Sequence, residues 1–457
     1  MKNSRCLVVG GGVIGCLAAY LVSKRYEEVF LVEKSENLGG LLNSFEQNGA
    51  IYDYGTHVPT LTGIGPLDEI LFGEELNRSD NYFSFPYLKS ENYFLGRQNQ
   101  TSSLIDARFI PNDKYNAGLA QLLEAPGAED SERQLYAHLI ATFGEVFTEE
   151  IFRPVLKKLV NAELEFLDKD ILNVFGLHRL IVLNESTSKE LKAIPKFDNK
   201  IAYHSYKDGL SRVSFCYPKG NCGVGAWVQA LIKQVESAGV EIITNNFVSK
   251  IEHSDAVIQS ATLGNGKTIE CDQVLWALPP ELALKASGIK YEGSAPAFRT
   301  HTLCHFEFEK PFLNTTAQYV MCWDPTMSTY RVTLYPNITE DRSKLKKYNL
   351  TVEVLSDSSA KTRLDDIQKT ALEELYQMSL VSPNNKVISA KVDYLGNSFP
   401  VITKEFQDNS AKILALTVGN LKNITVLGRS TTAKFSIHDL MVETFHRVSS
   451  LNRHSNT

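Results

Sequence analysis

A glycine-rich turn close to the N-terminus carries the clearest chemical pattern in this sequence. Residues 7–22 read LVVGGGVIGCLAAYLV, and Gly10, Gly12 and Gly15 within them form a GxGxxG motif. In such a motif the first glycine makes a tight turn, the second lets a pyrophosphate approach the backbone, and the third lets a helix and a strand pack. Glu33 ends the next apolar stretch. Its carboxylate can accept hydrogen bonds from a ribose diol, so the pattern predicts a dinucleotide site.

Three elements must position these groups. Residues 6–9 are predicted to form a buried strand, residues 16–24 a helix in which two alanines allow close packing, and residues 28–34 a second strand. Val13 and Ile14 lie in the turn that leads into the helix, where the N-terminal end of the helix dipole faces the anion. This strand-turn-helix-strand order is the context that the motif requires.

An export signal or a membrane anchor is the competing interpretation of the same run. Lys2 and Arg5 precede it, and VIGC ending at Cys16 faintly resembles a lipoprotein cleavage site. A membrane span needs about 20 apolar residues, whereas this run is shorter and contains four glycines. We therefore expect a nucleotide-binding fold in a chain without a transmembrane segment.

The composition excludes several other classes of protein. The chain has 457 residues, 43% of them hydrophobic, and a net charge of −6 with both signs intermixed, which does not fit a nucleic-acid-binding protein. Seven cysteines stand far apart without a CxxC pair, which favours a cytoplasmic location. Cys304 with His305, and Cys216 with Cys222, lack further ligands at the usual spacings, so no metal is expected.

The residues after the acid-tipped strand favour FAD over NAD. Gly39 and Gly40 form a second glycine pair that lets the backbone lie against a longer ligand. Asp53, Gly55 and His57 follow in a turn after a short strand. A simple NAD-binding domain needs neither addition, so we expect FAD as the cofactor.

These segments together resemble a known family. GGGVIG, VEKSENLGGLLNS and YDYGTHV are similar to the FAD-binding superfamily that contains protoporphyrinogen oxidases, amine oxidases and UDP-galactopyranose mutases. Many amine oxidases have Gly-Gly-Arg after the acid, whereas this chain has Leu41, as the mutase branch often does. YDYGTH resembles the Gly-Gly-His loop of that branch, with Thr56 in place of one glycine. The resemblance implies that His57 lies beside the flavin.

Three later segments resemble FAD motifs of the same superfamily, in the same order. Residues 217–252 are similar to the segment that re-enters the FAD domain, where backbone near Val248 would meet the adenine. Residues 271–280, CDQVLWALPP, resemble the strand and proline turn that close the domain. Residues 428–448 resemble the last motif, with a Gly-Arg turn, a Lys-aromatic pair and Asp439 opening a helix near the flavin. An aspartate there can also cap the helix.

Two segments favour the mutase branch of the superfamily, and two departures oppose it. In STYRVTLYPN, Arg331 matches a phosphate-binding arginine of the mutases, and residues 151–159 weakly resemble a helical motif of that branch. Phe435 stands where the mutases usually place a tyrosine that touches substrate phosphate, and Leu159 stands where a tryptophan is common. Arg331 also alternates with two threonines, so a solvated strand face is the other interpretation of this segment.

The order of the segments predicts the domain organisation. We expect an α/β protein with a Rossmann-type, GR2-like FAD-binding domain and a substrate domain of mixed helices and antiparallel sheet. The FAD domain is expected in three pieces, residues 1–60, 205–290 and 415–450. Residues 61–204 are expected to form a mainly helical insertion and residues 291–414 a β-rich insertion.

The expected site residues bind the cofactor or act on the substrate. His57 and Arg331 are the expected catalytic residues, and Arg331, Arg429 and Lys434 are expected to bind the substrate, a small molecule. The expected FAD contacts are Gly10, Gly12, Val13, Ile14, Gly15, Glu33, Lys34, Gly39, Gly40, Leu41, His57, Val248, Gly428, Arg429 and Asp439.

Three functions remain open at this point. The first is an FAD-dependent oxidoreductase, in which flavin N5 takes a hydride from a C–N or C–C bond. The second is a UDP-galactopyranose-mutase-like isomerase, in which reduced flavin attacks a nucleotide sugar and Arg331, Arg429 and Lys434 hold its diphosphate. The third is a non-catalytic protein that binds FAD as a structural ligand or sensor. The departures from the mutase pattern favour the oxidoreductase.

Overall fold

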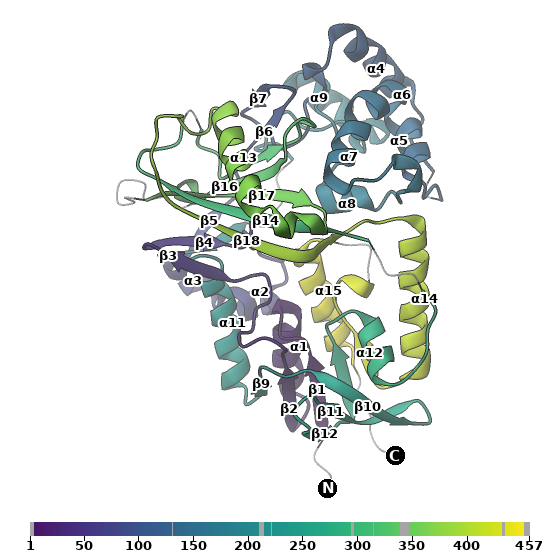
Figure 1. The fold of residues 1–457 in the computed structure, drawn as a ribbon. Helices are drawn as coiled ribbons and strands as arrows, with labels where there is room; N and C mark the ends of the chain where they lie inside the picture. Colours follow the sequence, from purple (N-terminus) through teal and green to yellow (C-terminus); the bar gives the residue numbers. More distant parts are fainter. Residues whose placement is uncertain are drawn as a thin grey trace.

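A nucleotide-binding part, a central sheet and a helical part make up the fold. In Figure 1 the nucleotide-binding part lies at the bottom with both ends of the chain, and the helical part lies at the upper right, beyond the central sheet. No helix in the described ranges is long and apolar enough to cross a membrane. The computed structural model describes residues 4–129, 131–209, 214–220, 222–293, 297–313, 315–338, 347–431 and 435–451.

The apolar stretches around the glycine motif form a five-stranded parallel sheet. The strand order is β19-β13-β1-β2-β9, with β1 in the centre. The last four residues of β1 are at most 2% exposed, because helices and strands cover both faces of a parallel sheet. The strands are β1 (Arg5–Val9), β2 (Glu28–Val32), β9 (Glu241–Ile243), β13 (Gln273–Trp276) and β19 (Ile424–Val426).

Helices cover one face of this sheet and a small antiparallel sheet covers the other. Helix α1 (Val13–Ser23) lies between α11 (Gly225–Ser237) and α15 (Ile437–Ser449) (Figure 1). The run that opens the sequence is therefore the first strand and helix of a Rossmann-type unit, as predicted, and the membrane anchor is excluded as its fold. The other face is covered by α12 (Pro280–Ala286), β10 (Val248–Ser254), β11 (Val257–Leu263) and β12 (Thr268–Glu270).

The central sheet has seven strands in the order β18-β14-β17-β16-β15-β6-β7. All neighbouring pairs are antiparallel except β6 and β15, which run parallel. Helix α13 (Leu364–Gln377) packs on one face. The sheet draws β6 and β7 from the insertion that was expected to be mainly helical and its other strands from the insertion that was expected to be β-rich. The strands are β6 (Ser90–Phe94), β7 (Arg97–Asn99), β14 (Phe298–Phe308), β15 (Tyr319–Cys322), β16 (Thr329–Leu334), β17 (Tyr348–Ser356) and β18 (Val387–Pro400).

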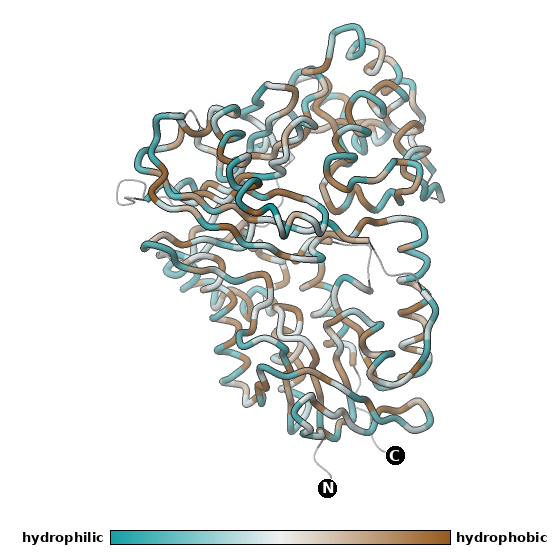
Figure 2. The backbone as a smooth tube through the Cα atoms, in the orientation of Figure 1, coloured by the Kyte–Doolittle hydropathy of each residue, from teal (hydrophilic) through white to brown (hydrophobic). Residues whose placement is uncertain are grey.

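The helical part has its own apolar core. Leu135, Leu139, Phe143 and Phe147 recur at helical spacing, and each is at most 1% exposed. In Figure 2 hydrophilic and hydrophobic residues alternate along the tube in this part of the fold. The helices are α4 (Asn112–Glu124), α5 (Leu135–Phe143), α6 (Glu145–Phe147), the π-helical turn Thr148–Phe152, α7 (Arg153–Val160), α8 (Ile171–Phe175), α9 (Glu185–Lys192) and α10 (Pro195–Asp198).

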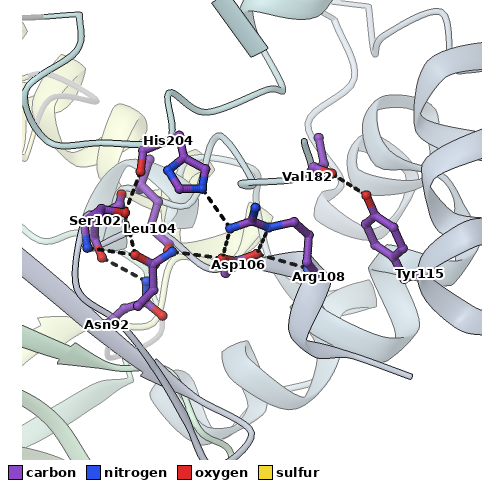
Figure 3. Close-up of polar contacts among 10 residues, drawn as sticks. Asn92, Ser102, Leu104, Asp106, Arg108, Tyr115, Val182 and His204 are labelled. Carbon is purple, nitrogen blue, oxygen red and sulfur yellow. Dashed lines mark hydrogen bonds and ion pairs between the residues drawn. The ribbon is translucent and has the colours of Figure 1, made fainter. Parts of the chain in front are cut away.

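A buried polar junction joins both ends of the helical part to the edge of the central sheet (Figure 3). The Asp106 carboxylate is fully buried and accepts hydrogen bonds from Nε and Nη2 of Arg108, at 2.7 and 2.6 Å, and from Nδ2 of Asn99, at 2.9 Å. Nη2 of Arg108 also lies 3.0 Å from Nε2 of His204. Asp106 begins the helical part and His204 follows its end. The Asp106 carboxylate binds Arg108, and Arg108 contacts His204, so one network joins the two connections between the helical part and the sheet.

Helix α14 (Lys404–Asn420) runs along α12 beside the nucleotide-binding part (Figure 1). The predicted domain boundary at residue 415 falls inside this helix. Strands β5 (Tyr82–Phe85) and β8 (Phe215–Pro218) pair with each other in an antiparallel two-stranded sheet. The remaining elements of the nucleotide-binding side are β3 (Ser44–Gln47), β4 (Ala50–Asp53), α2 (Gly65–Phe72) and α3 (Glu75–Asn81).

Candidate functional site

The carboxyl ends of β1 and β2 form a backbone cradle. The N–H of Gly11 donates to Oε2 of Glu33 at 2.7 Å, so the acid is fixed against the turn. A Cβ added at Gly15 would lie 1.7 Å from the carbonyl oxygen of Gly10, so only glycine lets α1 pack this closely. A Cβ added at Gly12 would meet no atom within 4 Å. The backbone at Gly12 therefore faces open space, as a pyrophosphate-binding turn requires.

The second glycine pair extends this cradle. The N–H of Gly39 donates to the carbonyl oxygen of Gly11 at 2.8 Å, and Gly40 has a φ of +61°. On the other side, the N–H of Asn246 donates to the carbonyl oxygen of Glu33 at 3.0 Å, and Val248 starts β10 two residues later. The structure thus brings the segments expected around the adenosine end of the dinucleotide next to each other.

The loop after β4 holds a half-buried histidine, His57. Nε2 of His57 lies 3.1 Å from the carbonyl oxygen of Tyr54. Burial lowers the pKa of His57 to about 4, and the nearby Arg331 charge acts in the same direction. His57 is therefore a neutral imidazole near pH 7, able to accept or donate a single hydrogen bond without carrying charge.

Arg331 on β16 is paired with a buried acid on β17. Its Nε lies 2.7 Å from Oε1 of Glu353 and its Nη2 lies 2.8 Å from Oε2, a two-point contact. Glu353 is fully buried. Burial alone would raise the pKa of Glu353, but the charge of Arg331 and the proximity of His301 hold that pKa well below its usual value. The guanidinium charge of Arg331 is therefore neutralised by a permanent carboxylate.

The same carboxylate reaches the His57 loop. The N–H of Thr56 donates to Oε1 of Glu353 at 3.1 Å, and the Thr56 hydroxyl contacts both Oε1 of Glu353 and the hydroxyl of Thr333. Nε2 of His301 lies 3.0 Å from Oε2 of Glu353. Sequence analysis did not single out Glu353 or His301. Glu353 joins Arg331 to the loop of His57 through Thr56, and His301 lies against the same carboxylate.

An aromatic cluster borders this charged group. Phe399 stacks on Phe175 and on Phe435, with ring centroids 5.9 and 5.8 Å apart, and meets the edges of His301 at 5.5 Å and Tyr330 at 6.3 Å. Offset stacking and edge contacts of this kind add to the free energy that burial supplies. The cluster holds Phe435, which follows β19, against the central sheet.

A cavity of about 670 Å³ opens on the far side of Phe435. Its wall includes Pro279 and Pro280, which follow β13, and Arg429, which follows β19. It therefore lies at the carboxyl ends of the parallel strands, the edge where open α/β sheets bind ligands. Helix α14 forms another side of the cavity.

Two aspartates of the FAD-like motifs fix nearby backbone. Asp53 accepts hydrogen bonds from the N–H of Val224 at 2.9 Å, the Ser44 hydroxyl at 2.6 Å and the Tyr217 hydroxyl at 2.7 Å, so it anchors the start of α11. Asp439 lies in the first turn of α15 and accepts a hydrogen bond from the hydroxyl of the N-cap residue, Ser436. Ser436, and not Asp439, is therefore the N-cap residue, and its hydroxyl also accepts a hydrogen bond from the N–H of Asp439 at 3.1 Å.

The remaining predicted residues fall into three classes. Val13 and Ile14 begin α1, and Gly428 follows β19 with a φ of +86° and open space around it. Lys34 and Leu41 are exposed at the rim of the cradle. Lys434 lies outside the described residues. Within those residues no group of three or more His, Cys, Asp or Glu side chains could hold a metal ion, and all seven cysteines are free thiols.

Comparisons with known proteins agree with this geometry. Residues 8–66 match the family model of the NAD(P)-binding Rossmann-like domain. The chain is 27% identical over 156 residues, 32% of its length, to a 4,4'-diapophytoene desaturase of Staphylococcus haemolyticus. It is 23% identical over 291 residues, 60% of its length, to a 4,4'-diapolycopene oxygenase of a Methylomonas species. These matches span 28% and 55% of the two relatives.

Solved structures cover the whole chain. A crystal structure of reduced UDP-galactopyranose mutase superposes with a TM-score of 0.76 at 16% identity and covers 99% of this chain and 97% of the mutase. A protein from Exiguobacterium sp. 255-15, assigned as a protoporphyrinogen oxidase, gives a TM-score of 0.69 at 15% identity, with 98% and 99% coverage. The chain has the fold of the FAD-dependent, amine oxidase-like superfamily. The resemblance and the fold class predicted from the sequence are confirmed.

The residues present fit FAD, the dinucleotide of this fold. Gly12 at the N-terminus of α1 leaves open space for a pyrophosphate, Gly428 after β19 also faces open space, and the carboxylate of Glu33 is fixed at the end of β2. The glycine pair at 39 and 40 continues the same surface. The superfamily's cofactor is therefore matched by the cradle that this chain builds.

Proposed function

We propose that this protein is an FAD-dependent oxidoreductase that oxidises a small organic molecule. The observation that carries the proposal is the glycine turn before α1. The backbone at Gly12 faces open space, and the close contact between Gly15 and the carbonyl oxygen of Gly10 leaves no room for a side chain at position 15. Bound FAD would supply a two-electron acceptor. Two curated relatives are named a desaturase and an oxygenase, which supports redox chemistry for this chain.

The cradle residues would hold the cofactor. The backbone from Gly10 to Gly15 and the N-terminus of α1 would bind the pyrophosphate, and Glu33 would accept hydrogen bonds from the adenosine ribose. Gly428 and Asp439 would border the flavin end, since they lie at the carboxyl end of β19 and at the start of α15. These residues bind and orient, and the reactivity comes from the cofactor.

The charge balance beside the His57 loop supports oxidation of an uncharged bond. His57 is neutral, and Arg331 is already paired with Glu353 through both of its facing donors. An uncharged substrate needs no charged partner in order to bind, so a locally neutral, partly buried environment can accept it. The pair would fix the Thr56–His57 backbone and exclude water from that face.

A mutase-like isomerase is the second candidate, favoured by the fold similarity over the whole chain to the reduced mutase structure. The pairing of Arg331 weighs against it. A diphosphate would have to displace Glu353 from the guanidinium, and the displaced carboxylate would then be buried without its main partner. The third candidate, a non-catalytic flavin-binding protein, requires that no substrate changes the redox state of the cofactor.

Flavin content and ligand titrations test these functions. The purified protein should be yellow and release FAD on heating. Gly12→Val should remove the flavin, whereas Gly419→Val, where an added Cβ also meets nothing within 4 Å, should retain it. A colourless wild-type protein that cannot be reconstituted with FAD would refute the proposal. Isomerisation of a UDP-sugar by the dithionite-reduced protein, without net oxidation, would establish the second candidate instead.

A further inference from the structure

One guanidinium faces the cavity without an acidic partner. Arg429 is exposed and lies over the ring of Phe435, 4.1 Å from its centroid. Within the part of the chain that the structure describes, no carboxylate pairs with it. Arg133, Arg153 and Arg331 each pair with at least one acid, whereas Arg97, like Arg429, lies over an aromatic ring. The contact with the ring uses the face of the guanidinium, so the N–H donors of Arg429 remain available for hydrogen bonds.

The aromatic cluster supports the ring on which Arg429 lies. Phe435 stacks on Phe399, with an interplanar angle of 26°, and Phe399 stacks on Phe175. These rings belong to three separate segments, so the ring beneath the guanidinium cannot move without disturbing the sheet. A preorganised planar guanidinium is the group that best binds a carboxylate through two parallel hydrogen bonds.

The rest of the cavity is mainly apolar. Thirteen of its twenty-three lining residues are Val, Ile, Leu, Ala, Pro or Phe. Helix α14 contributes Phe406, Ile413 and Leu414, and none of the apolar side chains of this helix is fully buried by the protein itself. A 17-residue helix with its apolar side chains turned to a cavity leaves surface that an apolar ligand would cover.

Two acidic residues also line the cavity, and each has a local reason for its charge. Glu281 lies in the first turn of α12 and Glu405 in the first turn of α14. A carboxylate in the first turn of a helix interacts favourably with the positive end of the helix dipole. The lining therefore carries two carboxylates and one guanidinium, and no ion pair with either carboxylate occupies the donors of Arg429.

We propose that this cavity binds an organic anion with an apolar body and one terminal carboxylate. The carboxylate would bind Arg429, and the body would pack against Phe406, Ile413 and Leu414. The volume of about 670 Å³ lies in the range of ligand pockets. The inference rests on the proposed function in one respect, because it takes the bound anion to be the substrate that the flavin oxidises. A nucleotide diphosphate fits less well, because one guanidinium and apolar walls leave most of its oxygens without donors.

Binding of cis-parinarate, a fluorescent polyene with one carboxylate, tests the proposal. The flavin-loaded protein is titrated with cis-parinarate and with its methyl ester, and fluorescence is followed. Wild-type protein should bind the anion about ten- to a hundred-fold more tightly than the ester, the ratio expected for a hydrogen bond to a charged group. Arg429→Gln should remove that preference and leave ester binding unchanged. Leu414→Glu should weaken binding of both probes.

Matched controls separate this inference from the proposed function. Arg363→Gln, an exposed arginine outside the cavity, should bind both probes as the wild type does. Equal binding of anion and ester by the wild type, or an anion preference that survives in Arg429→Gln, would overturn the inference. Loss of flavin from Arg429→Gln would also overturn it, since Arg429 would then belong to the cofactor. Protein that binds the anion through Arg429 but cannot be loaded with FAD would refute the proposed function alone.

Discussion

Arg331 and Glu353 form a two-point ion pair that joins two neighbouring strands to the loop of His57. The contacts are 2.7 and 2.8 Å long, and Glu353 is fully buried. The carboxylate also accepts a hydrogen bond from the N–H of Thr56, so a single acid fixes both the guanidinium and the loop. A buried pair of this kind stabilises little relative to apolar side chains, but removing one partner leaves the other charge unbalanced.

Replacing the acid alone should therefore destabilise the protein strongly. Glu353→Gln removes the charge that balances Arg331 and should lower the free energy of unfolding by about 3–5 kcal/mol, measured by urea denaturation. Glu353→Gln combined with Arg331→Met should recover a large part of that loss. If the single variant unfolds at the same urea concentration as the wild type, the pair is not a buried charge pair in solution.

His57 should remain uncharged through the whole neutral range. Its pKa is about 4 in the folded protein, against the usual value near 6.5. The contribution to stability is fully present above pH 6.5 and is lost as the pH falls toward 4, because the unfolded chain takes up the proton first. Between pH 7 and pH 4.5 the wild type should lose about 1–2 kcal/mol relative to His57→Gln. An imidazole signal that titrates near pH 6.5 and is absent from the variant would contradict this.

The two halves of the site differ in how far the sequence reveals them. The cradle is local: Gly10, Gly12, Gly15 and Glu33 lie within one strand-turn-helix-strand unit, so their spacing alone predicts their geometry. Glu353 comes from a strand about 300 residues after the loop that it binds, and no spacing rule connects the two. One signal was available. Glu353 is the single charged residue in the apolar strand YNLTVEVLS, and an acid buried among apolar residues needs a partner.

The domain organisation shows the same limit. Hydrophobic patterns predict strands within residues 291–414, but β6 and β7 of the same sheet come from the segment that was expected to be mainly helical, and the pairing of β6 with β15 joins segments far apart in the sequence. Helix α14 continues through the expected boundary at residue 415. Residues 411–418 contain no glycine or proline that would indicate a boundary between domains. Contacts over long sequence distances therefore decide what the local patterns leave open.

The junction at Asp106 should control the stability of the helical part separately from flavin binding. Asp106→Ala leaves the guanidinium of Arg108 and the amide of Asn99 without their shared acceptor. Unsatisfied buried groups cost about 1–3 kcal/mol each. Hydrogen exchange should accelerate in α4 to α10 and remain unchanged in α1 and β1, with flavin content retained. Uniform acceleration along the chain would show that the two parts unfold as one unit.

Asp53 should shift stability with pH in the direction opposite to His57. Burial raises the pKa of Asp53 to about 6 from a usual value near 4, although three donors oppose the shift. The folded chain therefore binds a proton more tightly than the unfolded chain. The stabilisation is complete below pH 4 and is lost as the pH rises through 6.

Asp53→Asn keeps the shape of the side chain but cannot titrate. We compare the free energies of unfolding of the wild type and Asp53→Asn. The difference should favour the wild type by about 2–3 kcal/mol more at pH 4 than at pH 7. Because the His57 contribution has the opposite sign and other histidines such as His138 and His178 also titrate in this range, only the comparison with each variant isolates the contributions of Asp53 and His57. A difference between wild type and Asp53→Asn that does not change with pH would show that Asp53 is ionised throughout and that its three donors outweigh its burial.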